Sequence, residues 1–458
     1  MPNRLCVLVA LSRSIVTLLA EKSGEVVPAA GWDEARDAIA VPPLRETPKL
    51  DVVYEAMRGR PVHLALLRHA TVANLQAALR EGPHVFLLDT HGREDGRLLL
   101  EGPCGETNLL LATELGALLA RRGVRLAVLS VCHSAVTAAA VRAAGVTVVI
   151  GMAESIYEDT AAAYLVAFLG ALGSGDSPRD AHRDGLARLR IRFGRRDGEA
   201  CLPRLLTVDY AAAQPLIADL AGGFEDVTPP LPAPAPPQPV ARLFGRELDQ
   251  VLAQRFLLQG DGRLATLTGM GGIGKTALAR TLACWAWRRD LFPGGVYFAS
   301  LENLTPGETV AARLVARLDL APGEGQSPEE ALAAALGGAA PALLVADNCE
   351  TAGPDAGLET LTDLRRRCPR LRVLATSRRP LELERESCHR LPPLALDDAV
   401  AMFLGRAWRP ERAGERATVE AICRRLDRVP LHIRLVASHQ VTPAKILTGL
   451  DDAHAPIA

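Results

Sequence analysis

The sequence predicts an α/β protein whose two domains are joined by a proline-rich linker. In each half, short apolar segments alternate with helical patterns, which is typical of a parallel sheet covered on both faces. Between the halves, residues 229–239 contain seven prolines in eleven positions, and such a segment favours an extended polyproline II spacer. We therefore expect a first domain at 1–225, a linker at 226–240, a second α/β domain at 241–380 and a small helical subdomain at 381–458.

Composition, charge and apolar patterning give no support for a nucleic-acid-binding, secreted or membrane-spanning protein. The 458 residues are 48% hydrophobic and 23% charged, and the net charge of −1 gives no electrostatic argument for direct nucleic-acid binding. Nine cysteines without metal-type spacing indicate reduced thiols and a cytoplasmic protein. The apolar segment Leu5–Ala20 is interrupted by Arg13 and lacks a cleavage site, so it does not resemble a signal peptide. No apolar run reaches 18 residues, and no membrane contact is expected.

Apolar segments in the first half are expected to form buried strands, with helices between them. The expected strands are Arg4–Ala10, His63–Leu67, His84–Asp89, Arg125–Ser130 and Thr147–Gly151. The expected helices are Thr71–Arg80, Leu109–Arg122, Ala135–Ala144 and Thr160–Leu172. In a parallel sheet of this kind, functional side chains lie at the carboxyl ends of the strands.

The second half opens with the same alternation and then becomes helical. Its expected strands are Leu264–Thr268, Gly295–Leu301, Ala342–Asp347 and Leu371–Thr376, with a helix at Ala277–Trp287. After about residue 380 the pattern predicts the helices Leu396–Trp408, Arg416–Leu426 and Leu431–His439.

A glycine-rich loop lies between the first expected strand of this half and its helix. It reads Gly269-Met270-Gly271-Gly272-Ile273-Gly274-Lys275-Thr276 and fits G-x-x-x-x-G-K-[ST] at every fixed position. Glycines let backbone amides face phosphate oxygens, and the helix N-terminus adds a favourable dipole. We expect Lys275, one of only four lysines, to neutralise the β- and γ-phosphates of ATP or ADP, and Thr276 to coordinate Mg²⁺. The alternative is a glycine-rich turn with an incidental lysine.

Two later strands end in residues that suit the same site. The strand expected at 342–347 ends in Asp347, which can hold the hydration shell of Mg²⁺. Glu350 either orients an attacking water or is a solvated loop carboxylate. Arg378 follows the strand expected at 371–376 and is a candidate sensor of the γ-phosphate, or else a surface arginine beside Arg379.

In the first half, a histidine and a cysteine follow two expected strands. His91 comes after the strand at 84–89 and Cys132 after the strand at 125–130, with one helix between them. If these strands are adjacent and parallel, both side chains project from one edge of the sheet. A neighbouring imidazolium lowers the pKa of a thiol, which lets the thiolate attack a carbonyl while the histidine protonates the leaving amine. Gly92 leaves room for a backbone N–H facing an oxyanion.

Other interpretations of these residues stay open. The pair can be a buried cysteine and a structural histidine at loop ends. His133 competes as the partner, although it neighbours Cys132 in sequence and would point elsewhere. Cys104 is a weaker candidate nucleophile, with no expected strand before it.

Residues 241–440 resemble the NB-ARC/STAND class of signalling NTPases. The matching motifs occur in order: Phe244-Gly245-Arg246-Glu247, which resembles the opening motif that lines the adenine; the loop Gly269–Thr276; Leu344–Glu350; Leu374–Arg378; Leu391–Leu394 with Asp397, Asp398, Ala399 and Phe403; and Val429-Pro430-Leu431, whose Pro430 would pack near the nucleotide. The resemblance implies an ATP/ADP switch that opens on exchange and forms a homo-oligomer. Such proteins usually continue into a winged helix and sensor repeats. Neither is present in the 458 residues, so we expect either that a separate sensor protein supplies this function or that the chain is cut short.

Residues 50–195 resemble the caspase-like CHAT peptidases. The resemblance covers Ala70–Leu79, the His91-Gly92 edge, Leu98–Glu101, Cys132, Gly145–Met152 and Thr160–Leu172. It implies a caspase–haemoglobinase fold with His91 and Cys132 as the catalytic dyad. In relatives that cut after Arg or Lys, an acid stands two residues before the cysteine. Here that residue is Ser130, so either Asp89 and Glu154 take over or the preferred residue is not basic.

The combined interpretation is a caspase-like cysteine endopeptidase gated by a STAND ATPase and acting on a protein substrate. Bacterial defence or cell-death-like signalling is the expected setting. The alternative is a transcription-linked ATP/ADP switch whose CHAT domain is an inactive interaction module. A third interpretation is a housekeeping ATPase chaperone. Replacing Cys132 separates the first from the second, because only the first requires its thiol.

Overall fold

The computed structural model describes residues 3–12, 16–20, 35–40, 47–93, 95–131, 134–152, 158–193, 203–207, 211–238, 243–259, 263–305, 307–352, 356–407, 414–439 and 441–453. The chain divides into two compact units, Met1–Pro230 and Leu231–Ala458. The division falls inside the segment 226–240 that the sequence predicts as a linker. Within the described ranges, every helix is too short or too polar to span a membrane.

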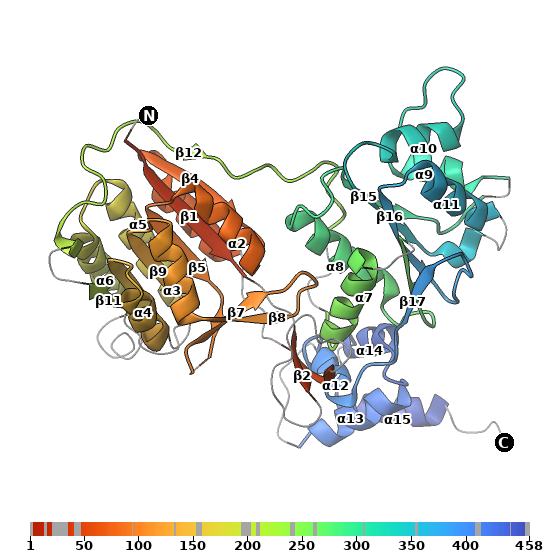
Figure 1. Ribbon diagram of the computed structural model, residues 1–458. Coiled ribbons are helices and arrows are strands. Elements are labelled where there is room, and N and C mark those ends of the chain that lie inside the picture. Colours follow the sequence, from red (N-terminus) through yellow and green to blue (C-terminus); the bar gives the residue numbers. More distant parts are fainter. Residues whose placement is uncertain are drawn as a thin grey trace. The chain divides into compact units, whose positions relative to one another are not determined.

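A seven-stranded sheet forms the centre of the first unit (Figure 1). Its strands are β1 (Leu5–Leu11), β4 (Val62–Leu67), β5 (Val85–Asp89), β9 (Leu126–Ser130), β10 (Val148–Met152), β11 (Pro203–Thr207) and β12 (Glu225–Asp226). They are arranged in the order β11-β10-β9-β5-β1-β4-β12, and all neighbours are parallel except β10 and β11. The five strands predicted for this half are β1, β4, β5, β9 and β10, each within one residue of its expected bounds.

Helices pack on both faces of this sheet. One face carries α1 (Thr47–Met57), α5 (Glu158–Gly173) and α6 (Pro178–Phe193), and the other carries α2 (Val72–Ala78), η2 (Leu79–Glu81), α3 (Ala112–Arg121) and α4 (Ser134–Ala143). Strand side chains alternate between the two faces. In β1, Val7 and Val9 pack into the core that contains Tyr164 of α5, whereas Leu8 and Ala10 pack into the opposite core. Both faces are therefore buried, which explains the continuously apolar strands.

Two smaller sheets and one 3-10 turn complete the described part of the first unit. Strands β2 (Val16–Ala20) and β3 (Ala35–Ala40) pair with each other, and η3 spans Ala211–Ala213. Strands β6 (His91–Gly92), β7 (Arg97–Glu101) and β8 (Thr107–Leu111) form an antiparallel sheet at the carboxyl end of β5. The sequence pattern predicted none of these pairings, and it assigned the residues of β8 partly to a helix.

The second unit contains a five-stranded parallel sheet. Its strands are β13 (Leu264–Thr268), β14 (Val296–Ser300), β15 (Ala342–Asp347), β16 (Leu371–Ser377) and β17 (Glu386–Arg390), in the order β14-β15-β16-β13-β17. The helices around it are α7 (Glu247–Gln259), α8 (Lys275–Arg288), α9 (Val310–Arg317), α10 (Pro328–Leu336) and α11 (Ala356–Arg367), with η4 at Cys349–Ala352. The four predicted strands are β13 to β16. Local signals also set the helix starts: α10 begins with a capping box between Ser327 and Glu330.

Four short helices follow the second sheet and form a lid. They are α12 (Leu396–Leu404), α13 (Arg416–Arg425), α14 (Pro430–Ala437) and α15 (Pro443–Ala453). The first three were predicted. Phe403, Ile422 and Ile433 pack together in a core of their own, so the lid is a small subdomain rather than an extension of the sheet.

The proline-rich segment, expected to be an extended spacer, also makes defined contacts with the second unit. Its carbonyl groups accept hydrogen bonds from α8: Trp287 Nε1 donates to the Pro232 oxygen at 2.6 Å, and Cys284 Sγ lies 3.1 Å from the Pro237 oxygen. Pro236 is buried. Prolines cannot donate to a sheet, but their carbonyls still accept. Residues 231–238 are therefore bound along the helix that begins at the phosphate-binding loop.

Trp287→Phe should loosen this segment, because phenylalanine keeps an aromatic ring and removes the N–H donor. Loss of one buried hydrogen bond corresponds to about a fivefold increase in local opening. We expect alkylation of Cys284 in the full chain, followed by mass spectrometry, to accelerate by about that factor. Cys423 is buried in the lid core and serves as the internal control. Equal labelling of Cys284 in both proteins would contradict the role given to Trp287.

Candidate functional site

The glycine-rich loop lies between β13 and α8, as the sequence predicts. Gly272 has φ of +75°, and a Cβ there would lie 2.8 Å from Cβ of Leu431 in α14. Glycine is required at this position both for the backbone conformation and for the close approach of the lid. The Leu431 amide donates to the Gly272 oxygen at 3.1 Å, so the first turn of α14 is attached to the loop.

Lys275 turns back over the loop from the first residue of α8. Its Nζ donates to the carbonyl oxygens of Gly269 at 2.8 Å and Met270 at 3.1 Å. Burial lowers the pKa of Lys275, and the charge of Glu350 partly offsets that effect. The ammonium group is thus placed inside the curve of the loop.

Thr276 and Asp347, predicted separately from two motifs, are in direct contact. Thr276 Oγ1 donates to Asp347 Oδ1 at 2.9 Å, and Thr376 Oγ1 of β16 donates to the same oxygen at 2.7 Å. Asp347 is only 2% exposed at the end of β15. A hydroxyl and a buried carboxylate at this spacing are the donor types that Mg²⁺ takes beside a bound phosphate. These residues therefore fit a magnesium–nucleotide complex.

Glu350 and Arg378 form an ion pair at the same end of the sheet. Arg378 Nε lies 3.4 Å from Glu350 Oε1, and the arginine side chain is 69% exposed. The sequence allows two alternative roles for each of these residues, and the structure shows that they contact each other. Both line the pocket described next.

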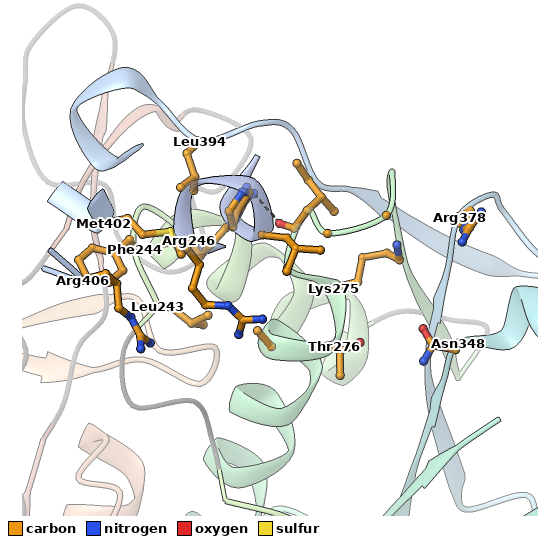
Figure 2. A pocket seen from close by; sticks show the side chains of 18 of the residues that line it. Leu243, Phe244, Arg246, Lys275, Thr276, Asn348, Arg378, Leu394, Met402 and Arg406 are labelled. Atoms are coloured by element: carbon orange, nitrogen blue, oxygen red, sulfur yellow. Dashed lines mark hydrogen bonds between the residues drawn. The ribbon is translucent and has the colours of Figure 1, made fainter. Parts of the chain in front are cut away.

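A cavity of about 380 Å³ opens beside the loop between the sheet and the lid. In Figure 2, Leu243, Phe244, Leu394 and Met402 lie toward one end and Lys275, Thr276, Asn348 and Arg378 toward the other. The apolar side chains thus gather at one end of the cavity together with Arg246 and Arg406, and Lys275 and Arg378 lie toward the other end. Its charged side chains are Arg246, Lys275, Arg378, Arg406, Arg434 and the single carboxylate Glu350. An apolar base with a polyanionic tail suits this division of chemistry.

Gly245, Arg246 and Pro430 take three different positions around the cavity. Pro430 lines it at the first position of α14. Arg246 also lines it, but its guanidinium donates hydrogen bonds to protein groups, namely Ile273 O, Pro392 O and Asp249. Gly245 has φ of +58°, and a Cβ there would lie 2.2 Å from Asp398 Oδ2. The lid helix α12 therefore occupies the space beside Gly245.

In the first unit, the strands that precede His91 and Cys132 are adjacent and parallel, as predicted. Asp89 of β5 pairs in register with Ser130 of β9, and His91 and Cys132 each follow two residues later. His91 is half-buried in β6, opposite Leu99 of β7. Cys132, His133 and Glu154 lie outside the described residues. The register brings the two chain segments to one edge of the sheet.

Hydroxyl groups hold the strand that carries Leu99 against this edge. Thr90 Oγ1 at the end of β5 donates to the Leu99 oxygen at 2.5 Å, and Ser12 Oγ, just beyond β1, donates to it at 3.5 Å. The Glu101 amide in turn donates to Ser12 Oγ at 2.6 Å. The position of β6, and with it His91, therefore depends on two small hydroxyl residues that sequence reasoning missed.

Buried polar groups surround the same edge. Asp89, predicted as a substitute specificity acid, is 1% exposed, and Ser130 is 5% exposed. Cys104 follows β7 closely, contrary to the expectation that no strand precedes it, and it is fully buried. Its amide donates to Glu106, and burial raises the pKa of that carboxyl group. Because Cys104 is fully buried, a substrate cannot reach its thiol, and Cys132 stays the candidate nucleophile.

One family model and several curated proteins match parts of this chain. Residues 12–198 match the sequence profile of the CHAT domain, whose fold is caspase-like, and this confirms the fold class predicted for the first unit. A Mycobacterium tuberculosis protein provisionally named an HTH-type transcriptional regulator is 36% identical over 203 residues, which are 43% of this chain and 22% of that protein. An uncharacterized protein of the same species is 38% identical over 216 residues, which are 45% of this chain and 53% of that protein. The matches thus span about half of the curated relatives' length or less.

Solved structures show weaker similarity. A STAND protein with a tetratricopeptide repeat sensor from Pyrococcus horikoshii has 16% identity and a TM-score of 0.30, covering 48% of this chain and 34% of that one. A RuvB mutant of Thermotoga maritima has 14% identity and a TM-score of 0.32, covering 48% and 73%. The P-loop α/β fold of the second unit rests on its own strand order and loop geometry.

Proposed function

We propose that the chain is a cysteine endopeptidase gated by the nucleotide state of its second unit. The observation that carries the nucleotide half is the contact of Thr276 with Asp347 beside Lys275, in a cavity whose apolar side chains lie toward the opposite end. Bound Mg²⁺ would supply charge neutralisation for the β- and γ-phosphates. In this proposal Lys275 and Arg378 bind phosphate oxygens, and the end lined by Phe244 and Met402 takes the adenine of ATP or ADP.

The peptidase half is supported by the match to the CHAT domain and by the register of β5 with β9. In the proposed reaction the Cys132 thiolate attacks the scissile carbonyl, and a thioester forms as the C–N bond breaks. The His91 imidazolium gives its proton to the leaving amine. Water then hydrolyses the thioester with His91 as the base, which restores the thiol.

We propose gating because both candidate sites belong to one chain. Exchange of ADP for ATP would change the contacts of the lid with the loop, and the opened form would assemble as a homo-oligomer that cuts a protein substrate. A separate sensor protein would supply the trigger, in a setting such as bacterial defence. The Leu431–Gly272 hydrogen bond supports the first step, since it ties the lid to the phosphate-binding loop.

Cleavage of a peptide library by the full chain, followed by mass spectrometry, tests the proposal. Reactions contain no nucleotide, ADP, or a non-hydrolysable ATP analogue, each with Mg²⁺. We expect cleavage with the ATP analogue to exceed cleavage with ADP by about tenfold, the size of an ordinary coupling free energy. Equal cleavage in all three conditions would refute gating. Binding of nucleotide without cleavage in any condition would refute the peptidase.

One observation favours the second candidate, a transcription-linked switch with an inactive first unit. A relative at 36% identity carries a transcriptional-regulator name. That candidate predicts nucleotide binding with no cleavage, so the same library experiment distinguishes it.

A further inference from the structure

Arg246 is one of the most enclosed charged side chains near the nucleotide cavity. It precedes α7 and is 4% exposed. A guanidinium carries five donors in a fixed fork, and burying it is costly unless those donors are used. The groups that accept hydrogen bonds from Arg246 therefore indicate the role of this residue.

The guanidinium joins two separate segments of backbone. Its Nη2 donates to Ile273 O in the phosphate-binding loop at 3.0 Å and to Pro392 O at 2.8 Å. Pro392 lies in the short segment between β17 and α12, which we call the hinge and define as residues 391–395. One nitrogen thus links the loop that would hold the phosphates to the segment that connects the sheet to the lid.

Asp249 holds Arg246 in this position, and the guanidinium also acts electrostatically on Asp398 of the lid. Its Nη1 donates to Asp249 Oδ2 at 2.8 Å, and Asp249 Oδ1 lies 2.8 Å from His389 Nε2 on β17. Burial alone would raise the pKa of Asp249, but the hydrogen bonds from His389 and Arg246 lower it. On the lid side, the charge of Arg246 lowers the pKa of Asp398, which burial raises overall. Asp398 is the residue that fills the space beside Gly245.

We propose that Arg246 is a positioning residue that locks the hinge of the lid to the phosphate-binding loop, rather than a ligand of the base. The inference deepens the proposed function, on which it rests for its nucleotide readout. A loop that shifts when phosphates bind would move Ile273 O, and the shared guanidinium would carry that movement to Pro392. Arg246 then acts on the lid through the hinge, and the neighbouring Gly245 leaves the space that Asp398 of α12 fills.

Arg246→Lys in the full chain tests the inference. Lysine keeps the charge beside Asp249, but its compact ammonium cannot reproduce the fork that reaches both carbonyls. Amide hydrogen exchange of Leu391 and Leu394 reports on the hinge, because these amides donate to Thr268 O and Arg428 O. We expect their exchange to accelerate by at least about tenfold in the nucleotide-free protein. The preference for ADP over GDP should stay unchanged while ADP dissociates faster.

Arg263→Lys is the matched control. Arg263 precedes the opposite end of β13 and also donates to backbone, to Cys368 O at 2.9 Å and Arg365 O at 2.8 Å. Its replacement should cost comparable stability and leave hinge exchange unchanged. Asp398→Asn provides a milder second variant, with a smaller acceleration confined to the hinge and the start of α12.

Two results would overturn the inference. One is unchanged hinge exchange in both Arg246→Lys and Asp398→Asn. The other is a changed preference between ADP and GDP in Arg246→Lys, which would make Arg246 a base ligand. A wild-type chain that binds no nucleotide would refute the proposed function instead, and the hinge exchange of the nucleotide-free protein would still decide the positioning role.

Discussion

Lys275→Ala should abolish nucleotide binding by the second unit. Removing one partner of a buried, hydrogen-bonded charge pair costs about 2–5 kcal/mol, so we expect the Kd for ADP to rise by about 30-fold or more. The fold should survive, because Lys275 donates to loop carbonyls that a ligand-free loop can expose to water. Titration calorimetry with ADP and Mg²⁺ measures the effect.

Lys445→Ala is the control for this prediction. Lys445 lies on α15 and is exposed, so its removal changes net charge equally without touching the loop. Wild-type affinity in Lys275→Ala, or an equal loss in both variants, would show that the cavity does not bind phosphates through this lysine.

Cys132→Ala should remove peptide cleavage altogether. Deleting a catalytic nucleophile lowers turnover by about 10⁴-fold or more, because no other group can form the thioester. Nucleotide binding should stay at the wild-type level, since the second unit contains its own loop and cavity. The library experiment described above measures turnover.

Cys104→Ala is the matched control for the nucleophile. Cys104 is fully buried beside Glu106, and its loss should leave cleavage unchanged apart from a modest loss of stability. Cleavage that persists in Cys132→Ala and disappears in Cys104→Ala would show that Cys104, and not Cys132, is the nucleophile.

The central strands could be predicted from sequence because both faces of each sheet are buried. A strand buried on both faces is apolar throughout, and β13 and β15 were predicted with their observed bounds. The small sheet containing β6 could not be predicted. Its first strand has two residues, and its position depends on hydrogen bonds from Ser12 and Thr90 to the Leu99 oxygen, contacts that no local pattern encodes.

The candidate site could likewise be predicted only in part from the sequence. Lys275 and Thr276 belong to one local motif, so sequence alone places them. The contact of Thr276 with Asp347 is tertiary, since β16 lies between β15 and β13. Arg246 was predicted to line the adenine. In the structure its guanidinium instead donates to Ile273 O and Pro392 O, which are 27 and 146 positions away. The bound proline-rich segment was equally hidden, because its partner Trp287 lies 55 positions from Pro232.

The central claim is that nucleotide state reaches an assembled cysteine–histidine dyad. The pH dependence of Cys132 alkylation tests it directly, measured by mass spectrometry in the wild-type chain and in His91→Ala, with ADP and with ATP. An imidazolium neighbour favours thiolate, so the account predicts an apparent pKa well below about 8.5 that rises in His91→Ala and differs between the two nucleotides. A pKa near about 8.5 in both proteins and with both nucleotides would contradict it.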